Sequence, residues 1–229
     1  MLPTIETPKH TLTLPISGKK IEFRPFLMKE QKVLLQAIEM GDESQLQNAI
    51  KDITSACTYN TVEIDKLPIG DVEFLFINLR MKSIGESVEL LYKCNKCEAI
   101  TPLEVKLSDI KIQELQDDKI ILEDSIGVIM QPLTYGMVKK ASEEKTDVDK
   151  AYRIILDSIK LVFDEDQTYT DFTDVELFEF LEKLSASNFD KIEKYTESQP
   201  TITKKIQVKC RNCGNEQEIE LKGLSDFLG

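Results

Sequence analysis

Four cysteines in two closely spaced pairs are the residues of this sequence best suited to chemistry. Cys94 and Cys97 lie in the segment KCNKC, and Cys210 and Cys213 lie in KCRNCG. A C-x2-C turn can present two sulfur atoms to one ion, so two such turns together supply the four ligands of a tetrahedral Zn²⁺ site. We therefore predict one shared structural zinc, bound by these four cysteines, that joins the middle of the chain to its C-terminal region.

Residues next to the cysteines could offset the charge of the predicted site and shape its two turns. Four thiolates around Zn²⁺ leave an excess of negative charge, which backbone N–H groups and nearby cations can offset. The candidate cations are the basic residues beside the cysteines, Lys93, Lys96, Lys209 and Arg211. Gly214 permits a tight turn after the second pair, whereas Glu98 takes the matching place after the first. We therefore expect the first turn to be less regular.

Other functions of paired cysteines fit the sequence less well. A catalytic zinc keeps one coordination position open for water or substrate, whereas four cysteines leave no position evidently open. No further candidate ligand lies near the four cysteines either. A thioredoxin-like redox pair needs its first cysteine at a helix N-terminus, whereas patterns typical of strands flank both pairs. The basic residues around the second pair could contact nucleic acid, but no aromatic residue is interleaved there for base stacking. A structural site remains the favoured interpretation.

The remaining reactive residues form no catalytic constellation. His10 is the only histidine and lies in a polar N-terminal stretch, where a surface position is expected. Cys57 falls on the apolar face of a predicted helix, which indicates a buried hydrophobic residue. Residues 164–166, an acidic triplet, lack the glycine and the terminal glutamate of a calcium loop. Because phosphate-binding loops and nucleophile elbows are also missing, we predict that the protein is not an enzyme.

Composition indicates a soluble intracellular protein. The chain has 229 residues, is 41% hydrophobic and contains five cysteines, too few for a secreted disulfide framework. Neither a signal peptide nor an apolar run of about 20 residues is present, so we expect no membrane-spanning segment. The formal net charge of −12 is the opposite of the balance expected for a nucleic-acid-binding protein.

Hydrophobic periodicity predicts a hairpin followed by three helices in the N-terminal part. Apolar and polar residues alternate around a Ser17-Gly18 turn, and the period becomes helical after Pro25. Gly41 is expected to end the first helix, and the third is expected to begin near Pro68. Strand patterns then surround both cysteine pairs.

The segment between the two cysteine pairs is predicted to be mainly helical. A hairpin is expected around residues 123–125, followed by a helix over residues 147–163. Thr173 and Glu176 fit a capping box that begins a further helix. A last helix is expected from Ser187 until shortly before Pro200.

A partial internal repeat supports a split zinc ribbon. Each cysteine pair is followed by a strand and then by Leu-Ser-Asp and an apolar residue, at 107–110 and at 224–227. The predicted fold is therefore α+β, with a split four-cysteine zinc ribbon made of β-knuckles. We predict three parts: an N-terminal hairpin and three-helix unit (1–86), the split ribbon (87–112 and 200–229) and a mainly helical insertion (113–199).

Several long stretches resemble one family. They are LPTIETPKHTLTLPISGKKIEFRPFLMKEQKVLL, IDKLPIGDVEFLFINLRMKSIGE, the first cysteine knuckle and QVKCRNCGNEQEIELKGLSDFLG, together with the helix around Phe189–Tyr195 and the following Ser198-Gln199-Pro200. With these stretches the sequence resembles the T4-type bacteriophage baseplate proteins, the family of the central hub subunit. The resemblance spans nearly the whole chain and is weakest over residues 112–172.

The resemblance implies a structural role in the baseplate hub of a contractile-tailed bacteriophage. The implied partners are other hub and tail proteins, without a small-molecule substrate. The implied locations are the host cytoplasm during assembly and the virion tail baseplate afterwards. Whether the chain stays in the virion or acts as an assembly chaperone is left open. The alternative is a zinc-ribbon protein that binds nucleic acid or regulates another process.

Overall fold

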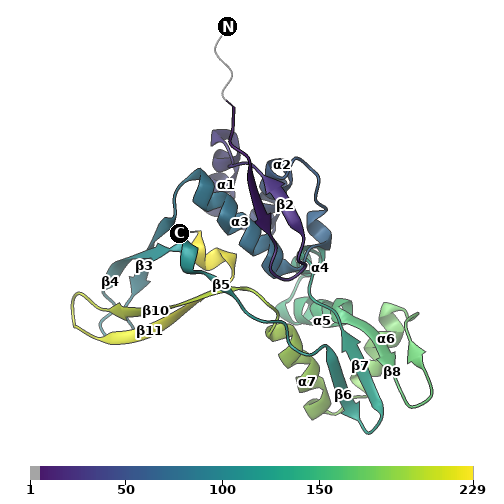
Figure 1. The fold of residues 1–229 in the computed structure, drawn as a ribbon. Coiled ribbons are helices and arrows are strands. Elements are labelled where there is room, and N and C mark those ends of the chain that lie inside the picture. Colours follow the sequence, from purple (N-terminus) through teal and green to yellow (C-terminus); the bar gives the residue numbers. More distant parts are fainter. Residues whose placement is uncertain (1–5, 229) are drawn as a thin grey trace. The chain divides into compact units, whose positions relative to one another are not determined.

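The computed structural model describes residues 6–228, and the chain forms two compact units (Figure 1). The first unit contains the chain up to Ile64, Gly70–Gln113 and the residues from Thr201 onward. The second unit contains Asp65–Ile69 and Glu114–Pro200. The structure confirms the α+β class, because several helices accompany small antiparallel sheets.

The N-terminal part of the first unit consists of a hairpin and three helices, as predicted. Their bounds are β1 His10–Thr13, β2 Lys20–Phe23, α1 Met28–Met40, α2 Glu43–Cys57 and α3 Ile69–Ser83. The 3-10 helix η1 (Ile64–Lys66) lies between α2 and α3 in the chain, and its last two residues belong to the second unit. Gly41 ends α1 in the left-handed conformation, with φ of 65°. Asp42 then begins α2, because its carboxylate accepts a hydrogen bond from the N–H of Gln45 at 3.0 Å.

Buried carboxylates fix the hairpin and α1 in this part of the unit. Asp71, in the first turn of α3, accepts the N–H groups of Ile16 and Ser17 in the hairpin turn, both at 2.9 Å. Glu30 in α1 pairs with the guanidinium of Arg24 at 2.9 Å. These contacts hold the short hairpin through charge-assisted hydrogen bonds, which are stronger than neutral ones.

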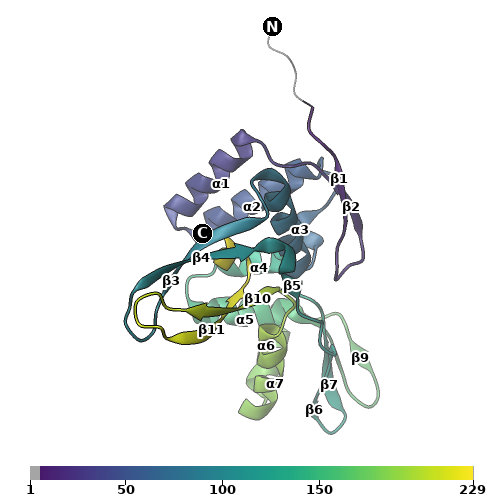
Figure 2. The ribbon, with the colours of Figure 1, turned by 60° about the vertical axis from the view of Figure 1, so that its left-hand side comes forward.

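Two longer hairpins form the cysteine-bearing part of the first unit (Figure 2). Their strands are β3 Ser87–Lys93 with β4 Ile100–Lys106, and β10 Ile202–Lys209 with β11 Glu216–Lys222. A short strand, β5 (Lys111–Ile112), pairs with β10. The predicted repeat is visible after each hairpin as a 3-10 helix, η2 (Leu107–Asp109) and η3 (Leu224–Phe227).

Glu73 connects α3 with the C-terminal hairpin inside the first unit. One oxygen of its carboxylate accepts hydrogen bonds from the Thr201 hydroxyl and from the N–H of Ile202, and the other accepts from the N–H of Leu224 at 3.2 Å. Burial of this side chain raises its pKa, although the three hydrogen bonds act to lower it. The carboxylate thus satisfies three buried donors that would otherwise lack partners.

The second unit packs helices on a four-stranded antiparallel sheet. The strand order is β6-β7-β8-β9. The bounds are β6 Lys119–Glu123, β7 Ile126–Met130, β8 Ile159–Phe163, β9 Thr168–Tyr169, α4 Tyr135–Ser142, α5 Asp147–Ser158, α6 Asp174–Glu182 and α7 Ala186–Glu197. Its core joins sheet residues such as Val128 and Met130 with Ile155, Leu181 and Ile192 from the helices.

One expectation for this segment needs correction. The helix predicted over 147–163 ends at Ser158, and residues 159–163 form β8 instead. Ile155, Ile159 and Val162 have helical spacing, but residues 159–163 pair with β7 and so form a strand. Helix α4 was not predicted. The capping box at Thr173 is confirmed, since its hydroxyl and the carboxylate of Glu176 each accept the other residue's N–H.

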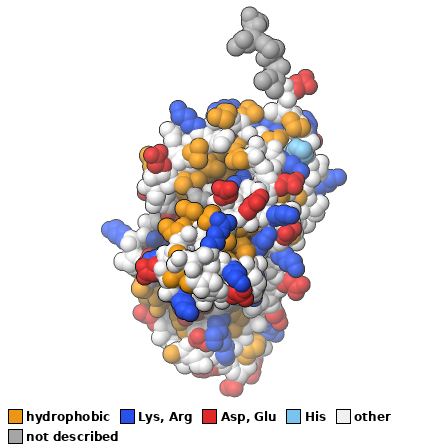
Figure 3. All heavy atoms as spheres, turned by 90° about the vertical axis from the view of Figure 1, so that its left-hand side faces the viewer, with side chains coloured by type: hydrophobic (Ala, Val, Ile, Leu, Met, Phe, Trp, Pro, Cys, Tyr) orange, Lys and Arg blue, Asp and Glu red, His pale blue; other side chains and the backbone are white. Residues whose placement is uncertain are grey.

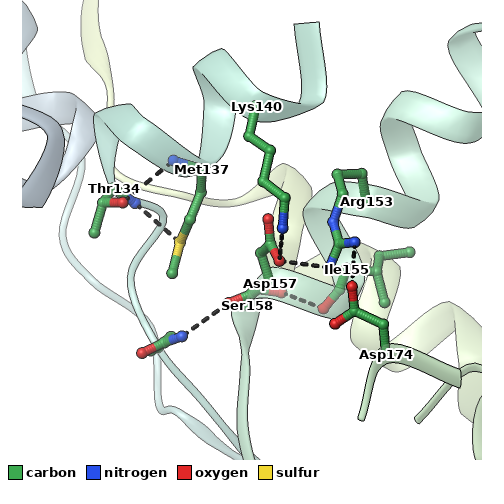
Figure 4. Close-up of polar contacts among 9 residues, drawn as sticks. Thr134, Met137, Lys140, Arg153, Ile155, Asp157, Ser158 and Asp174 are labelled. Carbon is green, nitrogen blue, oxygen red and sulfur yellow. Dashed lines mark hydrogen bonds and ion pairs between the residues drawn. The ribbon is translucent and has the colours of Figure 1, made fainter. Parts of the chain in front are cut away.

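A cluster of ion pairs lies on the helices of the second unit (Figure 4). Arg153 binds the carboxylates of Asp157 and Asp174, at 2.5 and 2.7 Å. Lys140 also contacts Asp157, at 3.2 Å. The cluster ties α4, α5 and the start of α6 together.

Among residues 6–228, no helix combines the length and the apolar character that crossing a membrane requires.

Candidate metal centre

Two hairpin tips with the same backbone hydrogen bonds hold the cysteine pairs. In the tip between β3 and β4, the N–H of Cys94 donates to the carbonyl of Ala99 at 3.0 Å, and the N–H of Glu98 donates to the carbonyl of Cys94 at 2.9 Å. The tip between β10 and β11 repeats these two bonds at 2.8 and 3.0 Å. Each turn therefore has the closed backbone of a knuckle, which can present two sulfur atoms to one ion.

The first knuckle is as regular as the second, contrary to expectation. Glu98 adopts the left-handed conformation with φ of 58°, close to the 68° of Gly214. A side chain in this conformation costs roughly 1–2 kcal/mol. The hydrogen bonds of the turn impose the conformation despite this cost.

The structure brings all four predicted ligands together. Their ligand atoms lie within 4.8 Å of one another. Between the hairpins, the Sγ atoms of Cys94 and Cys213 are 3.8 Å apart, and those of Cys97 and Cys210 are 3.6 Å apart. Zn–S bonds of about 2.3 Å place the sulfurs of a tetrahedral site about 3.8 Å apart. A disulfide requires about 2.05 Å, so these distances fit a shared ion.

Neutral donors contact the sulfur atoms. The backbone N–H of Lys96 lies 3.4 Å from Cys94 Sγ, and the side-chain amide of Asn212 lies 3.6 Å from Cys97 Sγ. A second amide, of Asn215, donates to the side chain of Asn95 at 3.0 Å and so connects the two knuckles. Sequence reasoning missed these asparagines; their position beside the cysteines was the available signal.

Two of the lysines predicted to offset the charge of the sulfurs pair with carboxylates. Lys93 pairs with Glu98 at 3.2 Å, and Lys209 pairs with Glu216 at 2.7 Å. These ammonium groups compensate carboxylates on the hairpins instead. The N–H and amide donors described above are the groups placed to stabilise negative sulfur.

The thiols differ in how readily they ionise. The backbone N–H groups of Cys213 and Asn212 lower the pKa of Cys210 to about 6, and the N–H of Ala99 lowers the pKa of Cys97. The N–H of Asn215 acts to lower the pKa of Cys213, but the neighbouring thiols and desolvation raise it to about 11. Crowded sulfurs thus resist full ionisation by themselves, and a bound cation would favour the thiolate form of all four.

The other candidate residues lie elsewhere. Cys57 is fully buried at the end of α2, with Arg24 Nη1 at 3.7 Å from its sulfur, and burial raises its pKa to about 11. His10 packs on Phe23, with ring centroids 5.5 Å apart. Asp164 closes a turn by accepting the N–H groups of Asp166 and Gln167. None of these residues joins the sulfur cluster.

Comparison with known proteins identifies the family of the chain. Residues 7–229 match the family model described as T4 bacteriophage base plate protein. Neither the curated proteins nor the solved structures gave a match. The family match includes both knuckles and nearly all of both units. The chain therefore belongs to the T4 bacteriophage base plate protein family.

Proposed function

We propose that this protein is a non-enzymatic component of the baseplate central hub, in which four cysteines bind one structural Zn²⁺. The family match over residues 7–229 supports the baseplate role. The approach of the four sulfurs within 4.8 Å supports the metal site and is the single observation on which it depends. The hub position and the identity of the metal go beyond the family match.

Zinc is the metal that this set of donors favours. Tetrahedral sites of four thiolates select zinc or iron–sulfur centres among the metals common in cells, and a structural zinc site is closed by four protein ligands. Cys94 and Cys97 would bind from one hairpin, Cys210 and Cys213 from the other. The ion would crosslink the tips of two hairpins, so metal-binding free energy becomes folding free energy.

A closed sulfur site also supports the absence of catalysis. Four protein ligands leave no position on the ion for water or substrate. The role we propose for the metal is to hold the C-terminal hairpin beside β3 and β4. The binding partners would be other hub and tail proteins, met first in the host cytoplasm and then in the assembled tail.

The nucleic-acid alternative receives little support from the surface. Near the second knuckle, Lys209 pairs with Glu216, and Lys204 lies 3.5 Å from Asp109. On the face in Figure 3, Lys and Arg side chains are interspersed with Asp and Glu. A phosphate-binding surface needs clustered uncompensated cations. We expect no retention on DNA or RNA at about 0.1 M salt, and retention that weakens as salt rises would favour the alternative.

Mass spectrometry of purified phage particles and of assembling baseplates tests the hub assignment. Chemical crosslinking before digestion would identify the neighbours. We expect the chain in at least the assembling baseplates, crosslinked to hub proteins. Presence in finished particles would indicate a permanent component, and presence only in intermediates would indicate a chaperone. Absence from both would contradict the assignment.

A further inference from the structure

A pocket of about 400 Å³ lies within the second unit, where β8, β9 and α6 meet. Aromatic rings form much of its wall: Phe163, Tyr169, Phe172 and Phe180. Tyr169 remains exposed, and the other three rings are half-buried. The pocket therefore presents aromatic surface at an opening that a side chain of another molecule can reach.

Three carboxylates line the same pocket. They belong to Asp164, Asp171 and Glu176. Among the residues described in the structure, no lysine or arginine forms an ion pair with any of them. Asp157 and Asp174 of the same unit differ in this respect, because Arg153 forms an ion pair with each of them (Figure 4).

Two of the three carboxylates are held in place by hydrogen bonds. Asp164 accepts the hydroxyl of Tyr169 at 2.7 Å, which together with backbone N–H groups lowers its pKa. Glu176 accepts the N–H and the hydroxyl of Thr173, both at 2.8 Å, and its pKa is also lowered. Both groups are therefore ionised at neutral pH and fixed beside the aromatic rings.

The second unit as a whole attracts cations. It contains 22 of the 41 acidic residues but 11 of the 29 basic ones, a difference of −11 in a chain whose net charge is −12. Such a charge favours encounter with basic partners and raises their association rate. Inside the unit, the ammonium of Lys119 already lies 5.1 Å from the ring centroid of Phe163. That ring thus accepts a cation in the folded protein.

Arginine matches this combination of groups better than other side chains. Its planar guanidinium stacks on aromatic rings and donates in parallel to carboxylate oxygens. Its aliphatic stem covers apolar surface while the charged head stays near the opening. We propose that this pocket binds an arginine side chain presented by a basic segment of a partner protein. The inference does not depend on the metal site.

Titration of the full-length protein with Nα-acetyl-arginine methylamide tests this inference. Nuclear magnetic resonance would follow the methyl groups of Ile126, Val162 and Leu177, which line the pocket. The matched probe is Nα-acetyl-citrulline methylamide, which has nearly the same shape without the charge. We expect saturable shifts of these methyl signals with the arginine probe and at least tenfold weaker binding of the citrulline probe. Equal binding of the two probes, or no shift of the three residues, would overturn the proposal.

A pair of charge-reversal variants separates the pocket from the general charge of the unit. Asp171→Lys changes a pocket carboxylate, whereas Glu179→Lys makes the same change at an exposed position of α6 that does not line the pocket. We expect at least a tenfold loss of arginine-probe affinity in Asp171→Lys and less than a threefold loss in Glu179→Lys. Equal losses would show that the probe responds only to net charge.

Discussion

At the residue scale, Glu98 shows how a turn overrides a side-chain preference. Two knuckles close with the same hydrogen bonds, yet one has glycine and the other has glutamate in the left-handed position. Replacing Glu98 with glycine removes a cost of roughly 1–2 kcal/mol, offset in part by the roughly 0.5–1 kcal/mol of added chain entropy. The exposed ion pair with Lys93 contributes little.

We therefore expect Glu98→Gly to stabilise the folded protein by about 0.5–1 kcal/mol. Urea unfolding of the metal-loaded protein would measure the change. Gly214→Ala is the matched opposite, and it should destabilise the second knuckle because alanine must adopt φ near 68°. An unchanged or lowered midpoint for Glu98→Gly would contradict this account of the turn.

Glu30 is a buried residue whose charge links stability to pH. Burial acts to raise its pKa, but hydrogen bonds from Arg24 and from the N–H of Leu27 outweigh burial and lower it. A lowered folded-state pKa means that the stabilisation is fully present above the ordinary value of 4.5 and is lost as the pH falls through the folded-state pKa.

Glu30→Gln should cost about 1–2 kcal/mol of unfolding free energy at pH 7, because a charged hydrogen-bond acceptor is lost. The difference from wild type should shrink as the pH falls below 4.5. Denaturation series at several pH values would measure it, with Glu39→Gln, at an exposed position of the same helix, as control. A difference that stays constant down to the acid transition would refute the assignment.

At the scale of elements, the sequence predicted the helix ends and starts that are marked by residues close together in the chain. Gly41 marks a helix end, and Thr173 with Glu176 marks a helix start. Residues 159–163 were misassigned because strand pairing with β7 is a contact between distant residues. The pocket and the role of Glu73 also depend on distant contacts, so periodicity along one segment could not show them.

The contact between α3 and the C-terminal hairpin depends on Glu73. Glu73→Ala would leave the hydroxyl of Thr201 and two backbone N–H groups without their acceptor. We expect a loss of about 2–4 kcal/mol, since each unsatisfied buried donor costs roughly 1–3 kcal/mol and the buried carboxylate has its own desolvation cost. Hydrogen exchange should accelerate at Ile202 and Leu224. Equal exchange in Glu73→Ala and in the exposed control Glu89→Ala would contradict this role.

At the scale of the whole molecule, the two units differ in charge and in the features they offer to partners. The first unit contains the sulfur cluster and is close to neutral, whereas the second contains the aromatic pocket and nearly all of the net charge. Because the chain belongs to the baseplate family, the sulfur cluster and the pocket belong to a protein that interacts with other phage structural proteins. The cysteine spacing predicted the first feature, and only the fold revealed the second.

Replacing one of the four proposed zinc ligands should loosen the C-terminal hairpin and lower solubility. We expect Cys210→Ser to abolish stoichiometric zinc binding and to lower the thermal midpoint by several degrees, because metal-binding free energy is lost from the folded state. Cys57→Ser changes a cysteine outside the cluster and should retain full zinc content. Unchanged melting of Cys210→Ser would mean that the hairpins hold together without the metal.

The central claim is tested most directly by metal analysis combined with thiol titration of anaerobically purified protein. The account predicts one zinc per chain and a single unliganded thiol, that of Cys57, which reacts only on unfolding because it is fully buried. Chelation should release the zinc and expose the four cluster thiols together. Protein that contains no metal, with the four cluster thiols freely reactive from the outset, would contradict the claim.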